Sequence, residues 1–500
     1  MLITNQINFF FYNIESLFVL IVVCLLLFLL CKKIQVKLNS KLLKNKLSNT
    51  NSFIHYIIYC FLNFFIILIS LYDKKFYFFN MCLVSTNFII FTKIIILISS
   101  LFILLVNFNY GEYEENFNNL EFYFLYFVSI LSFFILISSN DFLTLYLTIE
   151  LQTLIFYILT GFKQNSIWSI EAALKYFILG TFSSSILLYG ISMIYGYTGS
   201  LNFIEINSVF QINNVFNQNK FIIIGILLFL FSLMFKITAA PFHMWGPDVY
   251  QGAPTLITFF FSLTPKIVFL FLLIRLSLVL NSFLQPWSSY IFVSCGIFSM
   301  ILGSLSVILQ AKLKRMLAYS SISNIGYFLI ALSNNHLEGF ISGIFFIIIY
   351  LFVLISFFTA LITSRYFTNY IKIKNIAELL SVTNSNLSIN LCILVNLFSL
   401  VGIPPFAGFF SKLYLFVVTI SSELYVLLFF AILSSIISAI IYLRLVRLSF
   451  FNKSNSIFLF TPVTKYNSFI LMFCLMFNFL ILFDSTLIMI FIVDALFSEF

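Results

Sequence analysis

Charged side chains lie inside long apolar runs of this sequence, where a charge is costly. On membrane-insertion scales, each charge near the centre of a span costs about 2.5–3.5 kcal/mol, and such residues commonly serve proton or ion transport. The lysines in these runs are Lys93, Lys175, Lys236, Lys266 and Lys412, and the acids are Glu150, Glu171, Asp484 and Asp494. Buried groups of this kind can form a proton relay, in which each group accepts a proton and passes it on.

The spacing separates these residues into two kinds. Glu171 and Lys175 are four residues apart, so on a helix they share a face and can neutralise each other. Four residues have no such local partner: Glu150, Lys236, Lys266 and Lys412. Desolvation disfavours the charged form of a buried lysine, which can then gain and lose a proton near neutral pH. Two unit charges about 7 Å apart interact by roughly 2.4 kcal/mol at an effective dielectric constant near 20, enough for one protonation to displace the next proton.

The remaining intramembrane polar residues have simpler interpretations. Lys93 is interpreted as an anchor whose long stem lets the charge reach the membrane surface, and the same reading is open for Lys266. Asp494 lies near the chain end, in contact with water, whereas Asp484 falls inside the last apolar run and has no explanation. His243 is kept as a possible relay residue, although histidines at such places are more often packed or hydrogen-bonded.

Proline interrupts two of the apolar runs close to a lysine. The stretch "AAPFHMW" places Pro241 five residues after Lys236, and "GIPPFAGFF" places Pro404 and Pro405 shortly before Lys412. Proline breaks a helix, and open backbone at membrane depth is tolerated only beside protein or water. The breaks are therefore predicted to hydrate the two lysines. The alternative is that proline only kinks two helices for packing.

The composition shows which elements must position these residues. The chain of 500 residues is 62% hydrophobic and only 9% charged, against about 25% charged residues in soluble domains. It is therefore predicted to be an all-α polytopic membrane protein. Its formal charge of +9 reflects lysines in the loops and does not indicate nucleic acid. The seven cysteines form no CxxC pair, so neither a metal centre nor a disulfide framework is expected.

Fourteen apolar runs are long enough to span a membrane, for which about 20 residues are needed. They lie near 14–31, 53–71, 84–108, 121–139, 141–161, 169–195, 221–241, 253–279, 286–309, 316–333, 338–363, 387–420, 422–446 and 466–495. Lysine and arginine are far commoner in the loops of one side, beginning with the loop 32–52. The positive-inside rule places these loops in the matrix or cytoplasm, and both termini in the intermembrane space or periplasm.

The two broken runs, the seventh and the twelfth, indicate an internal repeat. The offset that carries Pro241 to Pro405 also carries the fourth run to the ninth and the eighth to the thirteenth. The five-helix units at 121–279 and 286–446 are therefore predicted to be copies, inverted because five is odd. Inverted repeats with broken helices are typical of transporters. A three-helix segment, 1–120, precedes the repeats, and a C-terminal helix, 447–500, follows them.

Several motifs resemble the proton-translocating, antiporter-like membrane subunits of respiratory complex I. They are "FKITAAPFHMWGPDVYQGAP" (235–254), "KRMLAYSSISNIGY" (314–327) and "GIPPFAGFFSK" (402–412). The stretches "EAALKYFILG" (171–180) and "LTIELQTL" (147–154) are similar to the N-type branch, NADH dehydrogenase subunit 2, and a lysine at position 412 suits that branch. The resemblance covers about 120–450.

The resemblance implies a role for each relay residue. Glu150 and Lys236 would be the coupled pair at the input, with Lys175 modulating them, Lys266 as the central relay and Lys412 as the outlet. Flavin, iron–sulfur clusters and quinone would be held by partner subunits, and this chain would hold no cofactor or metal. Neighbouring antiporter-like and other membrane subunits would flank it, together with lipids, in the mitochondrial inner membrane or a bacterial plasma membrane. The alternative is a subunit of a Mrp-type sodium/proton antiporter.

Overall fold

The computed structural model describes residues 65–66, 68–69, 72, 75–78, 81–113, 117, 119–212, 220–285, 287–364, 375–378, 387–450 and 463–499. The predicted first span, 14–31, and the lysine-rich loop 32–52 lie outside the described residues, as does most of the second span, 53–71. The chain packs as two compact units, one ending at Leu159 and the other beginning at Thr160. The predicted repeat and domain boundaries stay predictions.

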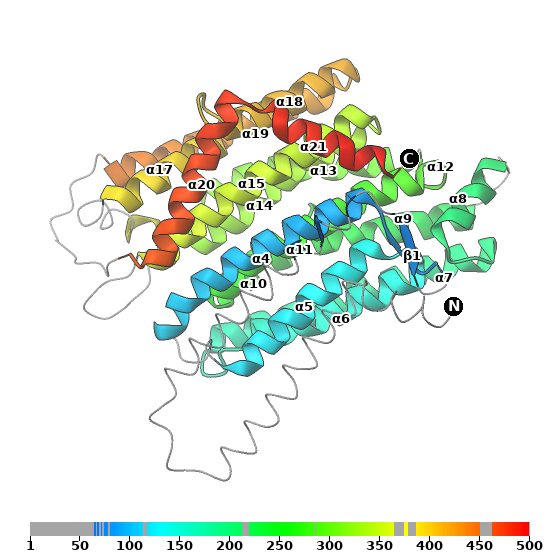
Figure 1. Cartoon of the computed structure of the whole chain (residues 1–500), viewed down its shortest axis with the longest axis horizontal. Coiled ribbons are helices and arrows are strands. Elements are labelled where there is room, and N and C mark those ends of the chain that lie inside the picture. The colour runs from blue at the N-terminus through cyan, green and yellow to red at the C-terminus, as the bar shows by residue number, and fades with distance from the viewer. Residues whose placement is uncertain are drawn as a thin grey trace, which may run out of the picture. The chain divides into compact units, whose positions relative to one another are not determined.

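The first unit contains a short hairpin and three long helices. The hairpin pairs β1 (Phe76–Phe78) antiparallel with β2 (Leu83–Ser85). The helices are α4 (Asn87–Tyr113), α5 (Leu120–Ser138) and α6 (Phe142–Thr160), and α4 and α5 lie side by side (Figure 1). Tyr126 on α5 donates to Ser100 O on α4 at 2.8 Å. Lys93 on α4 is buried, 3% exposed, which does not fit the interpretation as a surface anchor.

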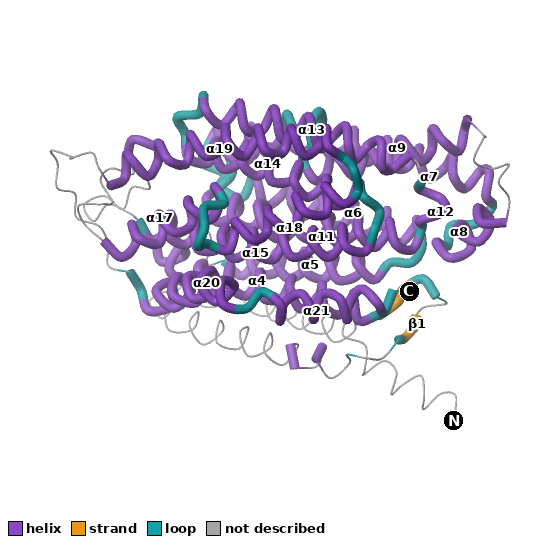
Figure 2. Tube along the Cα trace, turned by 90° about the horizontal axis from the view of Figure 1, so that it is seen from above, coloured by secondary structure: helices purple, strands orange, loops and turns teal. Residues whose placement is uncertain are grey.

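The second unit is a bundle of long helices that contains both helix breaks (Figure 2). Its first half comprises α7 (Ile167–Thr198), α8 (Phe203–Ile212), α9 (Lys220–Ile237), α10 (Trp245–Gly252), α11 (Thr255–Val279) and α12 (Asn281–Leu284). Its second half comprises α13 (Trp287–Ile308), α14 (Leu313–Ser333), α15 (Leu337–Thr363), η4 (Ile376–Glu378), α17 (Leu387–Val401), α18 (Ala407–Ser421), α19 (Tyr425–Phe450), α20 (Lys465–Phe483) and α21 (Thr486–Phe497). The short helix α8 was not predicted, because it is too short to span a membrane.

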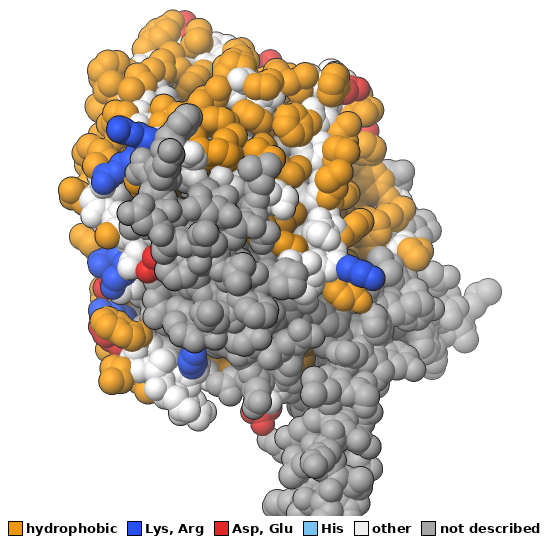
Figure 3. All heavy atoms as spheres, turned by 90° about the vertical axis from the view of Figure 1, so that its left-hand side faces the viewer, with side chains coloured by type: hydrophobic (Ala, Val, Ile, Leu, Met, Phe, Trp, Pro, Cys, Tyr) orange, Lys and Arg blue, Asp and Glu red, His pale blue; other side chains and the backbone are white. Residues whose placement is uncertain are grey.

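The core of this unit is formed by α11, α14 and α15, which pack against one another and are the most buried of the described spans. In contrast, α7, α19 and α20 expose many apolar side chains, as a membrane-facing surface requires. In the space-filling view, hydrophobic side chains cover the upper part of the described surface, with lysine and arginine in small groups (Figure 3). Buried polar and charged side chains that could carry protons are therefore to be sought on the three central helices and the helices packed against them.

Both predicted helix breaks are present. The helix α9 ends at Ile237, the Ala240–Pro241 peptide bond is cis, and α10 begins at Trp245. The helix α17 ends at Val401, Gly402 has a φ of +88°, the Pro404–Pro405 bond is cis, and α18 begins at Ala407. A Cβ atom on Gly408 would lie 1.7 Å from Ser399 O, so glycine is what lets the two half-helices touch.

The last predicted span, 466–495, is two helices with a break at Asp484. The carboxylate of Asp484 accepts the backbone N–H of Thr486 at 2.9 Å and its hydroxyl at 2.5 Å, so it satisfies donors at the start of α21. The side chain is exposed on the surface of the unit. This local capping role explains an acid for which the sequence offered no reason.

Candidate functional site

Lys236 lies in the last turn of α9, immediately before the first break, and its side chain is buried, 7% exposed. The end of the helix is tied back by two contacts: Ala239 N donates to Met234 O, and Trp245 Nε1 donates to Phe235 O at 3.1 Å. A cation at a helix C-terminus is favoured by the partial negative charge of the final carbonyl groups. The break thus places the ammonium group of Lys236 at the end of a helix inside the bundle.

Lys266 lies on α11 and joins three helices through its ammonium group. Its Nζ donates to Ser321 Oγ on α14 at 2.5 Å and lies 5.2 Å from the ring centroid of Tyr250 on α10. The Tyr250 hydroxyl is itself held, because it donates to Phe261 O at 3.1 Å. The lysine is buried, 5% exposed. This burial does not fit the alternative reading of Lys266 as a surface anchor.

Lys412 lies on α18 and binds the helix end on the other side of its break. Its Nζ donates to Leu400 O and Val401 O, each at 2.8 Å, and these are the final carbonyl groups of α17. The ammonium also lies 5.3 Å from the ring centroid of Tyr327 on α14. The hydroxyl of Tyr327 is within hydrogen-bonding distance of Ser434 Oγ at 2.8 Å and donates to Ala431 O on α19 at 3.1 Å.

The helix α14 therefore connects two of the predicted relay lysines. Ser321 contacts Lys266, and Tyr327 contacts Lys412. These two residues are six positions apart, about 9 Å along the helix axis, and Asn324 lies midway between them. The hydroxyl of Tyr350 on α15 is buried beside Ser321 and Asn324. Hydroxyl and amide groups that both donate and accept thus lie along the segment of α14 that contacts the two cations.

The sequence did not single out these connecting residues. Tyr250, Ser321 and Tyr327 fall within motifs that were recognised, but no role was assigned to them. The available signal was that α14 is the least apolar of the described spans while being one of the most buried. Polar residues on a buried helix need partners.

Glu150 lies on α6, in the first unit. It is half-buried, its Oε2 is 3.5 Å from Thr153 Oγ1, and its Oε1 is buried with no hydrogen bond within the described part of the chain. The other predicted relay residues lie in the second unit. The predicted coupling of Glu150 with Lys236 therefore stays a prediction.

Unlike the buried lysines Lys236, Lys266 and Lys412, Lys175 belongs to a half-exposed cluster of four charged residues. Its Nζ is 2.8 Å from Glu171 Oε1, so the predicted i, i+4 pair is present. The same Nζ is 3.2 Å from Asp248 Oδ2, and Arg315 Nη2 is 3.1 Å from Asp248 Oδ1. These side chains are between 37% and 48% exposed and line a cavity of about 290 Å³. The sequence missed Asp248 and Arg315, because they are distant from Lys175 along the chain.

His243 lies in the turn that follows Pro241 and is buried, 7% exposed. Its backbone carbonyl accepts Gly246 N at 3.0 Å, while its Nδ1 has no hydrogen-bond partner among the described residues. The contacts therefore anchor its backbone in the break and leave its possible relay role a prediction. Across the described ranges, no group of three or more His, Cys, Asp or Glu residues could hold a metal ion.

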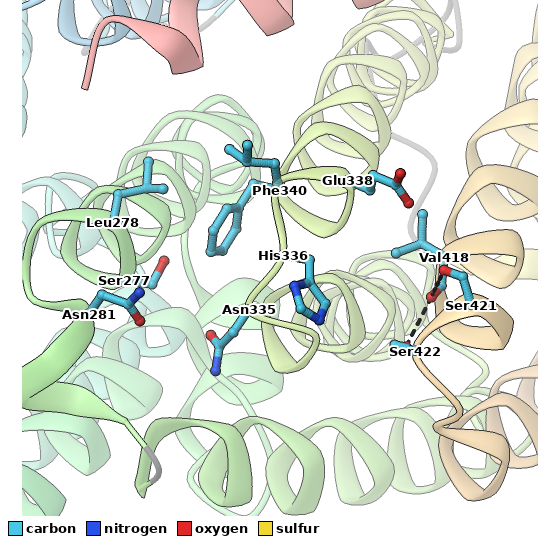
Figure 4. A pocket seen from close by; sticks show the side chains of 11 residues that line it. Ser277, Leu278, Asn281, Asn335, His336, Glu338, Phe340, Val418, Ser421 and Ser422 are labelled. Carbon is cyan, nitrogen blue, oxygen red and sulfur yellow. Dashed lines mark hydrogen bonds between the residues drawn. The ribbon is translucent and has the colours of Figure 1, made fainter. Parts of the chain in front are cut away.

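A second cavity, of about 590 Å³, lies at the ends of helices that carry predicted relay residues. It is lined by Ser277, Leu278, Asn281, Asn335, His336, Leu337, Glu338, Phe340, Val418, Ser421 and Ser422. These come from the end of α11, the start of α12, the turn between α14 and α15, the start of α15, and the end of α18 (Figure 4). In this view the ring of His336 lies between Asn335 and Ser422, and Glu338 points toward Val418. The helices that carry Lys266, Ser321 and Lys412 thus converge on one polar cavity.

Comparison with known proteins places the whole arrangement in a family. Residues 139–438 match the family described as "NADH:quinone oxidoreductase/Mrp antiporter, TM". NADH-ubiquinone oxidoreductase chain 2 of Marchantia polymorpha is 39% identical, over 82% of this chain and 83% of the relative. NADH-quinone oxidoreductase subunit N of Bartonella bacilliformis is 37% identical, over 79% of this chain and 81% of the relative.

Two solved structures share the fold. A chain of respiratory complex I from Thermus thermophilus aligns with a TM-score of 0.75 at 23% identity, covering 94% of this chain and 98% of that chain. A chain of the Mrp complex from Dietzia sp. aligns with a TM-score of 0.70 at 19% identity, covering 90% and 81% respectively. The likeness at these identities concerns the fold alone.

Proposed function

The chain belongs to the NADH:quinone oxidoreductase/Mrp antiporter family, and from that premise we propose that it translocates protons as the N-type, or chain 2, membrane subunit of complex I. Its protons move through Glu150 and Lys236 at the input, Lys266 at the centre and Lys412 at the outlet. One observation carries the proposal most: Lys266 and Lys412 are both buried and both contact polar side chains of α14.

The contacts support proton transfer between the two lysines. Lys266 donates to Ser321, and a hydroxyl that accepts one proton can donate another. In this proposal a proton leaves Lys266 through Ser321 and ordered water and reaches Lys412, whose charge is stabilised by two helix-end carbonyl groups, while Asn324 and Tyr327 orient the water. Because like charges inside the bundle repel each other, protonation of Lys412 disfavours a second proton on Lys266. The two sites therefore alternate.

The cavity at the ends of α11, α14 and α18 is the release side in this proposal. It holds His336 and Glu338, which can exchange protons with bulk water, and it lies at loops that are poor in lysine. By the positive-inside rule, that side is the intermembrane space or periplasm, where both termini are also placed. The membrane itself is the mitochondrial inner membrane or a bacterial plasma membrane.

Electron transfer takes place in partner subunits in this proposal, which hold the flavin, the iron–sulfur clusters and the quinone. The exposed apolar faces of α7 and α19 support flanking contacts with membrane subunits and lipids. A second candidate, a subunit of a Mrp-type antiporter, is favoured by the shared fold. Mass spectrometry of the purified native complex separates the two, since only complex I contains flavin- and iron–sulfur-binding subunits.

The test of the relay is the number of protons moved per NADH oxidised by membranes that contain equal amounts of assembled complex. Lys266→Met removes the central titratable group and should lower this ratio and coupled NADH oxidation steeply. Lys220→Met is the control, because Lys220 is exposed at the start of α9 and lies outside the relay. Normal pumping by Lys266→Met would overturn the proposal.

A further inference from the structure

The short helix α10 is held tightly against α7. The indole of Trp245 stacks on the ring of Tyr176, with 4.9 Å between centroids. At its other end, a Cβ atom on Gly252 would lie 2.4 Å from Trp168 O and 2.7 Å from Ala172 Cβ. The two helices therefore touch at both ends of α10, and α10 moves only if these contacts open.

Between these two contacts, ion pairs of Asp248 hold α10 in place. Asp248 accepts from Lys175 of α7 through one carboxylate oxygen and from Arg315 of α14 through the other, at 3.2 and 3.1 Å. Lys314 of α14 also donates to Ala253 O, directly after α10, at 2.6 Å. Glu171 holds Lys175 from the far side at 2.8 Å. Asp248 is thus the residue of α10 that forms ion pairs with both neighbouring helices, α7 and α14.

The same helix carries the aromatic ring that faces the central lysine. Tyr250 lies two residues after Asp248, is buried, and has its ring centroid 5.2 Å from Lys266 Nζ. A cation over an aromatic face is stabilised by the ring quadrupole, and this stabilisation depends on position. Any movement of α10 would therefore change the surroundings of Lys266.

We propose that Asp248 is a positioning residue for proton transfer: by bridging Lys175 and Arg315 it fixes α10 and so sets the Tyr250 ring beside Lys266. This inference rests on the proposed function of Lys266. It also explains how Lys175 could influence Lys266: Lys175 holds Asp248, which positions α10 and with it the Tyr250 ring. The bridge lines a cavity and its side chains are more than one-third exposed, so water can reach it and the bridge can open and close.

The experiment compares Asp248→Asn with the unchanged complex, at matched amounts of assembled protein. We expect the protons moved per NADH to fall by roughly two- to fivefold, the range that a half-exposed ion pair supports. Asp248→Glu keeps the charge and should recover most of the loss. Glu205→Gln, which removes an exposed carboxylate on α8, is the matched control and should pump normally.

A double-mutant cycle separates positioning from general destabilisation. If Lys175 acts through Asp248, then Lys175→Gln combined with Asp248→Asn should be no worse than Asp248→Asn alone. Additive losses, or normal pumping by Asp248→Asn, would overturn the inference. If Asp248→Asn does not assemble, Lys175→Gln and Arg315→Gln each remove one contact, and normal pumping by either would overturn it.

Lys266→Met in the same series distinguishes the two proposals. A defect in Lys266→Met with normal pumping by Asp248→Asn contradicts the positioning role alone. Normal pumping by Lys266→Met contradicts the relay itself.

Discussion

Lys412 Nζ lies 2.8 Å from Val401 O, the last carbonyl group of the half-helix that precedes its own. The lysine therefore spans the break and satisfies an acceptor that the break exposes. Unpaired carbonyl groups at a helix end need such partners, above all where water is scarce. The titratable group is in this way also part of what holds the broken helix together.

This double role predicts different outcomes for two variants of Lys412. Lys412→Met leaves two buried carbonyl groups without this donor, at about 1–3 kcal/mol for each unsatisfied acceptor. We expect lower thermal stability of the complex and loss of pumping. Lys412→Arg keeps donors and charge but does not release a proton, so it should assemble and still not pump. Pumping by the Arg variant would contradict a relay role at this position.

Lys236 should behave differently, because its Met variant keeps the apolar stem and removes a costly charge. We expect Lys236→Met to assemble normally and to pump poorly. Lys236→Arg should also fail, since guanidinium stays protonated. The measurement is proton uptake per NADH. A structural lysine would give the reverse pattern, with Arg restoring both assembly and pumping.

The contact between Lys266 and Ser321 can be tested within one helix. Ser321→Ala removes the hydroxyl that accepts from Lys266 and should slow pumping by several-fold, with little effect on assembly. Ser323→Ala is the control, because its hydroxyl donates only to Ser320 O, at 2.8 Å, among the bonds described. Equal behaviour of the two variants in a proton-pumping assay would exclude Ser321 from the path.

Gly408 should be intolerant of any side chain. In Gly408→Ala the new Cβ would overlap Ser399 O, so α17 and α18 would be forced apart and Lys412 displaced. We expect loss of assembled complex on native gels. Gly196→Ala is the control: a Cβ there meets nothing within 4 Å, and alanine is favoured over glycine in a helix by about 1 kcal/mol.

The position of the larger cavity can be tested by labelling. Ser422→Cys should react with a membrane-impermeant thiol reagent added from the intermembrane-space or periplasmic side, because its loop is poor in lysine. Lys312→Cys should react only from the opposite side. Labelling of both variants from one side would show that the topology is wrong.

The sequence predicted those features that depend on local chemistry. Long apolar runs predicted the helices, and the prolines predicted the breaks at Pro241 and Pro404, because both signals can be read from a short stretch of sequence. The break at Asp484 was missed, since it contains neither proline nor glycine and depends on capping of Thr486.

Contacts between distant segments were beyond such reasoning. The bridge from Lys175 through Asp248 to Arg315 joins three helices, and nothing in the local spacing indicates it. The same holds for Ser321 and Tyr327, which were visible in a motif but acquire meaning only through the lysines packed against them. The motifs contain these residues, but only the packing of α14 against α11 and α18 shows which lysine each of them contacts.

The shared helix α14 also fixes a register. Ser321 and Tyr327 can meet their two lysines together only while they stay six positions apart, because each residue adds 100° of rotation and 1.5 Å of rise. A single inserted or deleted residue between them would turn one of the two side chains away from its lysine. A change in the length of this segment would therefore separate α14 from at least one of the two lysines that it contacts.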